Sequence, residues 1–119
     1  MSNRYARLCL EEAVKYGRTR KTFGKRLMDH QVLRHKVAEM ARNIESCHAM
    51  LEQVAYQMKV GTDDQYMAGM IALTKVHATK TFDLCAREAT QIMGGKDAYT
   101  HTTSDHNSIS QRCMFGGVC

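Results

Sequence analysis

Two long runs of heptad-spaced apolar residues, uninterrupted by any proline in the 119-residue chain, restrict its possible folds more than any other feature. In the first run the spacing alternates strictly between four and three residues, which places all its members on one face of a helix. The run predicts a helix from about His30 to Val60, with Asp29 as N-cap and Gly61 just beyond its end. The members are Leu33, Val37, Met40, Ile44, Cys47, Leu51, Val54 and Met58.

The second run predicts a helix of matching length that ends at Met93. Thr62 to Gln65 has the T-x-x-Q form of a capping box, in which Thr62 would cap the helix and Asp63 and Asp64 would lie where its dipole favours anions. Two rods of about 45 Å joined by a Gly-Thr link should form an antiparallel hairpin. The stripe consists of Met67, Ile71, Thr74, Ala78, Cys85, Ala89 and Ile92.

A shorter helix is expected from Tyr5 to about Tyr16, with its apolar side toward the hairpin. The predicted fold class is therefore all-α, an up-down helical bundle built on a long antiparallel helix hairpin. We expect residues 1–95 to form a partial bundle domain. Residues 96–119 are polar, rich in Ser and Thr and aperiodic, so we expect an irregular tail.

Composition excludes several classes of site. The five cysteines form no C-x-x-C pair and the six histidines no H-E-x-x-H, so neither a zinc site nor a disulfide framework is indicated. Cysteines on the helical stripes are expected to be small core residues in a reducing intracellular compartment. No apolar run reaches the roughly eighteen residues that a membrane span needs.

The segment from Arg18 to Arg26 is the most unusual polar feature, because five of its nine residues are cationic around a single aromatic, Phe23. A basic turn before a helix start suits a pyrophosphate, for which Arg20 could provide a bidentate contact and Thr22 a hydroxyl. Phe23 could offer a flat surface to a ring or ribose. The structural alternative is that the cations are solvated and Phe23 plugs the bundle.

A second polar position lies near the end of the second long helix, in the sequence ATQIMGG. Gln91 is followed by the apolar Ile92 and Met93, where burial without a partner would be costly. Gly94 and Gly95 would permit close backbone approach. The alternative is an ordinary helix end with an exposed glutamine.

These two segments together resemble the C-terminal helical domain of the acyl-CoA dehydrogenases. The resemblance rests on RKTFGKRLMDHQ at 20–31, KVAEMA at 36–41 and ATQIMGG at 89–95, in that order and spacing. It implies binding of FAD and conversion of an acyl-CoA thioester to a trans-2-enoyl-CoA, in a homo-oligomer with FAD at the subunit interface.

Motif matching implies cofactor-binding roles for seven residues. Arg20 and Phe23, with Thr22 between them, would reach the FAD of a neighbouring subunit. Gln91, Gly94 and Gly95 would lie at the adenosine diphosphate end, and Gln31 is a weaker match. No residue matches the glutamate or the upstream position that serves as base in the family, so no catalytic residue is assigned and the chain is expected to be an incomplete domain, inactive alone.

Two other functions remain open at this stage. One is a non-catalytic helical module that pairs through its hairpin with a relative. The other is nucleic-acid binding by the basic turn, which a single aromatic and a net charge of only +5 disfavour, so no nucleic-acid partner is expected. Mitochondrial, peroxisomal and cytoplasmic locations are equally compatible with the sequence.

Overall fold

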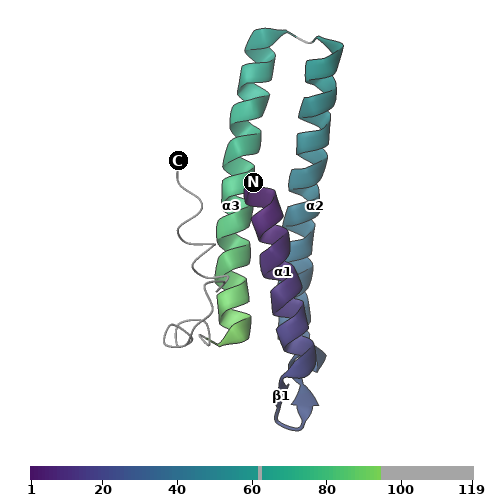
Figure 1. Cartoon of the computed structure of the whole chain (residues 1–119), viewed down its shortest axis with the longest axis vertical. Coiled ribbons are helices and arrows are strands. Elements are labelled where there is room, and N and C mark those ends of the chain that lie inside the picture. Colours follow the sequence, from purple (N-terminus) through teal and green to yellow (C-terminus); the bar gives the residue numbers. More distant parts are fainter. Residues whose placement is uncertain (62, 95–119) are drawn as a thin grey trace, which may run out of the picture.

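The computed structural model describes residues 1–61 and 63–94, which form three helices and a very small β-hairpin (Figure 1). The elements follow in the order α1 (Ser2–Thr19), β1 (Lys21–Thr22), β2 (Lys25–Arg26), the 3₁₀ turn η1 (Leu27–Asp29), α2 (Gln31–Val60) and α3 (Asp64–Met93). The all-α class and the long helix hairpin are confirmed. The division at residue 95 stays a prediction, since the expected tail lies outside the described residues.

The turn between α2 and α3 depends on one glycine and one carboxylate. Gly61 ends α2 with a φ of 81°, in the left-handed region that glycine adopts without strain. Asp63 caps α3 by accepting a hydrogen bond of 3.2 Å from the backbone N–H of Tyr66. The prediction of Thr62 as the capping residue is therefore wrong by one position, and Thr62 itself lies outside the described residues.

The start of α2 also differs from the prediction. His30 is the N-cap residue and makes no side-chain capping bond, while Asp29 closes the preceding 3₁₀ turn. The Asp29 carboxylate instead accepts a hydrogen bond of 3.2 Å from the backbone N–H of Arg26. Asp29 thus stabilises the small hairpin rather than the long helix.

Helix α1 is longer than the expected Tyr5–Tyr16 and packs against both α2 and α3 along their proximal halves, the ends near the small hairpin (Figure 1). Small side chains on its inner face let the helix axes approach closely. Arg7 pairs with Glu45 of α2 at 3.0 Å, and the ring of Tyr5 lies 6.3 Å from that of Phe82 on α3. The core joins Ala6, Cys9, Ala13, Met40, Ile44, Cys85, Ala89 and Ile92.

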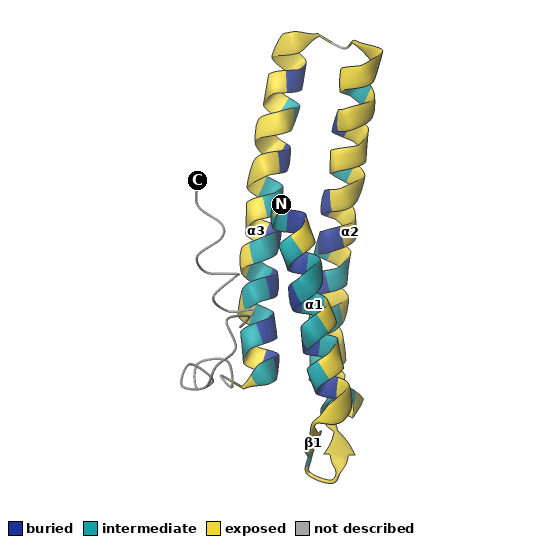
Figure 2. Ribbon diagram, in the orientation of Figure 1, coloured by how far each residue is buried: buried dark blue, intermediate teal, exposed yellow. Residues whose placement is uncertain are grey.

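The distal halves of α2 and α3 have no third helix against them among the described residues (Figure 2). Val54 and Met67 are buried between the two helices, as their stripes predict. Leu51 and Met58, predicted for the same face of α2, are 41% and 60% exposed. Further exposed apolar side chains of this region are Tyr56, Val60, Tyr66, Ile71, Leu73 and Val76.

Candidate functional site

The basic turn is a two-stranded antiparallel hairpin closed by Phe23 and Gly24. Lys21 pairs with Arg26 and Thr22 with Lys25, which leaves a two-residue loop. Both loop residues have positive φ, 52° at Phe23 and 77° at Gly24, as a type I′ turn requires. Glycine adopts this conformation freely, whereas a bulky side chain rarely does. Phe23 therefore holds a strained backbone conformation at the hairpin tip.

The ring of Phe23 is 97% exposed, which rules out the interpretation that it plugs the bundle. An exposed aromatic ring gains nothing from burial within its own chain. A strained conformation combined with an exposed aromatic ring is typical of functional positions. The feature is therefore best explained by a contact outside the described residues.

The five cations lie at the end of α1 and along the two strands on either side of Phe23. Arg20 is the C-cap of α1 and has an extended backbone, and its N–H donates to the Tyr16 carbonyl at 2.9 Å. All five side chains are exposed, and within residues 1–61 and 63–94 none is paired with a carboxylate. Unpaired cations next to an exposed flat ring favour an anion that also has an aromatic part.

The two remaining candidates of this segment have side chains near the start of α2. The Thr22 hydroxyl is 3.5 Å from Nε2 of His30 and is half-buried, so it faces the start of α2 rather than the tip. Gln31 is exposed, with its amide nitrogen 3.3 Å from Nε2 of His35. Neither side chain lies at the tip with Phe23.

The end of α3 follows the ordinary pattern of a glycine-capped helix. Gly94 has a φ of 65°, and its N–H donates to the Gln91 carbonyl at 3.2 Å. Gln91 is exposed, which agrees with the alternative of an ordinary helix end rather than with a buried glutamine that needs a partner. Within residues 1–61 and 63–94, nothing lies within 4 Å of the position that a Cβ on Gly94 would take. Gly95 lies outside the described residues.

The hairpin and the end of α3 lie toward the same end of the bundle (Figure 1). Among the described residues, no hydrogen bond or ion pair joins the two segments. The structure therefore places Arg20 at the base and Phe23 at the tip of one small hairpin, and leaves Gln91 and Gly94 as a separate group at that end of the bundle.

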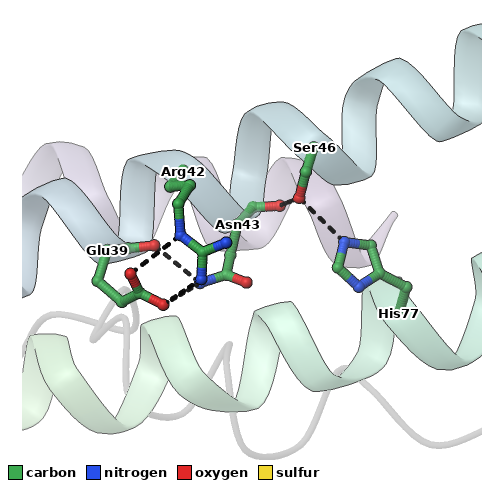
Figure 3. Close-up of polar contacts among 5 residues, drawn as sticks. All are labelled: Glu39, Arg42, Asn43, Ser46 and His77. Carbon is green, nitrogen blue, oxygen red and sulfur yellow. Dashed lines mark hydrogen bonds and ion pairs between the residues drawn. The ribbon is translucent and has the colours of Figure 1, made fainter.

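A polar network that the sequence did not indicate links the middle of the two long helices (Figure 3). Ser46 of α2 lies 3.1 Å from Nε2 of His77 on α3, and its hydroxyl donates to the Asn43 carbonyl at 3.0 Å. Because serine has a single O–H, the His77 ring nitrogen donates to Oγ whenever the hydroxyl donates to the Asn43 carbonyl. The neighbouring Arg42 donates a hydrogen bond to the Glu39 carboxylate, and this bond lowers the pKa of the Glu39 carboxyl. The network joins α2 to α3 and carries no catalytic arrangement.

The described part of the chain shows neither a metal-binding group nor a membrane-spanning helix. It contains no group of three or more histidine, cysteine or acidic side chains that could hold a metal ion. None of its helices is both long and apolar enough to cross a membrane. An open groove runs along α1 toward the hairpin and is lined by Leu10, Glu11, Val14, Lys15, Arg18 and Thr19.

The comparison with protein families gives one match, to the acyl-CoA dehydrogenase C-terminal domain, over residues 1–114. Acyl-CoA dehydrogenase AFT10-1 of Alternaria alternata is 44% identical over 104 residues, which cover 83% of this chain and 24% of that protein. Acyl-CoA dehydrogenase apdG of Emericella nidulans is 34% identical over 95 residues, covering 77% and 22% respectively. The chain thus spans about a quarter of the length of these relatives.

The fold agrees with a solved structure. A probable acyl CoA dehydrogenase from Mycobacterium abscessus superposes with a TM-score of 0.79 at 27% identity. The alignment covers 98% of this chain and 30% of that one. Similarity in both sequence and structure therefore extends over nearly the whole chain.

Proposed function

The chain belongs to the acyl-CoA dehydrogenase family, and on that premise we propose that it is an FAD-binding helical domain of an oxidoreductase that converts acyl-CoA thioesters to trans-2-enoyl-CoA. The observation that carries the proposal is Phe23, 97% exposed and strained at the tip of a basic hairpin. FAD has flat rings joined through a pyrophosphate, which are the two features that this tip could recognise. When bound, the flavin takes up the two hydrogens removed from the acyl chain.

Each proposed residue has a separate task toward the cofactor. The Arg20 guanidinium suits a phosphate bidentately, and the Phe23 ring offers a flat face to the ring system or the ribose. The Thr22 hydroxyl, near His30, offers a polar group on the side of the hairpin that faces the start of α2. At the end of α3, the exposed Gln91 amide and the open space around Gly94 suit the adenosine diphosphate part, with Gly95 next to them.

The direction of the hairpin supports binding across a subunit boundary. Its tip extends beyond the end of the bundle, away from the core of its own chain (Figure 1). A ring that has no contact within its own bundle is suited to the cofactor of a neighbouring subunit in a homo-oligomer. The acyl-CoA would be the substrate of the complete enzyme, and we assign no residue of this chain as its catalytic base.

Flavin retention tests the assignment directly. In the assembled holoenzyme, Arg20→Ala, Phe23→Ala and Gln91→Ala should each raise the dissociation constant of FAD, measured from the quenching of flavin fluorescence. The matched control is Lys59→Ala, which removes a cation in the last turn of α2, at the opposite end of the molecule. Unchanged FAD affinity in both Arg20→Ala and Phe23→Ala would contradict the proposed cofactor site.

The distal half of the α2–α3 helix hairpin favours a second candidate function, that of a non-catalytic helical module for oligomerisation. Leu73 and Val76 are 61% and 54% exposed, and residues 66–74 contain no charged side chain. An uncharged apolar surface of this kind favours association with a second copy. Sedimentation of the chain should then show a defined oligomer that Leu73→Glu dissociates without loss of helix content. A monomer, or aggregation without a defined stoichiometry, would rule this candidate out.

A further inference from the structure

A glycine near the end of α1 is needed for space rather than for backbone conformation. Gly17 is buried and does not have a positive φ, so its backbone would accept alanine. A glycine inside a helix costs about 0.5–1 kcal/mol relative to alanine. A Cβ on Gly17, however, would lie 2.8 Å from both Cγ and Sδ of Met28. The close approach of Met28 explains why a glycine is accommodated there.

The Gly17–Met28 contact lies at the base of the small hairpin. Gly17 precedes the hairpin in α1, and Met28 follows it in η1. Two hydrogen bonds close the same base: Leu27 N–H donates to the Arg20 carbonyl at 2.8 Å, and Arg26 N–H donates to the Asp29 carboxylate at 3.2 Å. The two-residue strands themselves make few bonds, so these base contacts fix the direction of the hairpin.

A small change at the base moves the tip appreciably. At about 3.3 Å per residue, the tip stands on the order of 10 Å from η1, so a tilt of about 6° displaces the Phe23 ring by about 1 Å. A misplacement of that size in a ligand-positioning group can cost up to about a hundredfold in function. The direction of the hairpin is therefore a property that binding depends on.

We propose that the contact between Gly17 and Met28 sets the direction of the hairpin and thereby positions Phe23 on the FAD. Gly17 and Met28 are positioning residues, and neither touches the cofactor. The inference rests on the proposed function, since it assumes that the hairpin tip binds FAD. Beyond that function, the packing of α1 against η1 sets the affinity for FAD.

The test is a double-mutant cycle on the holoenzyme, with the FAD dissociation constant as readout. Gly17→Ala should raise this constant about tenfold, because Met28 must move and the hairpin tilts with it. Met28→Ala removes both atoms that the new methyl would meet, so the double variant should return to within about threefold of the wild type. A double variant no better than Gly17→Ala, or Gly17→Ala with wild-type affinity, overturns the proposal.

A second readout does not depend on the cofactor. Exchange of the Leu27 amide hydrogen, which reports the bond to Arg20, should accelerate in Gly17→Ala and recover in the double variant; an unchanged rate counts against the proposal. If Gly17→Ala does not fold, Met28→Ala alone must loosen the same amide and weaken FAD, or the proposal fails. Phe23→Ala separates the two hypotheses: normal FAD binding in that variant refutes the proposed function, whereas weakened binding there with normal binding in Gly17→Ala refutes only the positioning role.

Discussion

Replacement of Phe23 by asparagine should stabilise the chain while it weakens FAD binding. A non-glycine residue in the left-handed region costs roughly 1–2 kcal/mol, and asparagine is among the few side chains that adopt it routinely. Asn-Gly is also the preferred pair for a two-residue hairpin. Since the Phe23 ring is 97% exposed, its removal sacrifices almost no burial. We expect the free energy of unfolding to rise by about 1 kcal/mol.

Thermal unfolding followed by circular dichroism measures this effect. A gain of 1 kcal/mol corresponds to roughly 4–8 °C in the unfolding midpoint of a domain of this size. Phe23→Ala is the matched control, because it removes the ring and keeps the left-handed strain, so its midpoint should change little. Val32→Asn controls for the loss of another exposed apolar side chain, 68% exposed on α2. A lower midpoint in Phe23→Asn, or an equal gain in Phe23→Ala, would refute the explanation by backbone strain.

Three further predictions concern single side chains of the bundle. Asp63→Ala should lower the free energy of unfolding by about 1 kcal/mol, because the N-cap bond from Tyr66 N–H to Asp63 is lost. The control variant Asp64→Ala should have a smaller effect. Equal losses of stability in urea titrations of the two variants would contradict the role of Asp63 as the cap. Thr81→Val should raise the free energy of unfolding by about 1 kcal/mol, because the buried Thr81 hydroxyl has no hydrogen-bond partner among the described residues, and a lower urea midpoint would disprove this. Burial raises the pKa of the Cys47 thiol above its usual 9.0, so the folded state holds this proton more tightly than the unfolded state. The free energy of unfolding should therefore fall as pH rises through 9. Cys47→Ala should flatten this decline, and an unaltered pH profile in that variant would contradict the prediction.

The long helices were predictable because their signals are local and repeated. The inner face of α2 carries an apolar residue at every turn and that of α3 at most turns, and Gly61 and Gly94 end the two helices where the pattern stops. The caps were less predictable. Thr62, Asp63 and Asp64 all have side chains that can cap, and composition alone does not decide which residue the turn brings into position.

The small β-hairpin could not be predicted from the sequence, for two physical reasons. Strands of two residues are too short to show an alternating pattern, and Phe-Gly is not the usual pair for its turn. The cations and Phe23 were identified as a candidate site, but the exposure and the positive φ of Phe23 follow from that turn. For Gln91 the sequence left burial and exposure open, and the helix phase accounts for its exposure: Ala89 and Ile92 are buried, and Gln91 lies off the face that they define.

Helical periodicity also predicted more burial than the described residues provide. Leu51 and Met58 follow the same heptad spacing as Met40 and Ile44, yet only the latter pair is fully buried. A periodic stripe indicates that a face packs against something, and it carries no information about which element supplies the contact.

The core position of α1 has a consequence for the order of folding. Ala6 and Cys9 belong to the first helix, whereas Cys85 and Ile92 lie near the end of the described chain, and the core forms only when these segments meet. Contacts so distant in sequence require closure of a long loop and form slowly. On the ribosome, the α2–α3 turn can form locally while the inner face of α1 has only α2 to pack against. That face, with its thiol, then stays incompletely covered until the end of α3 emerges.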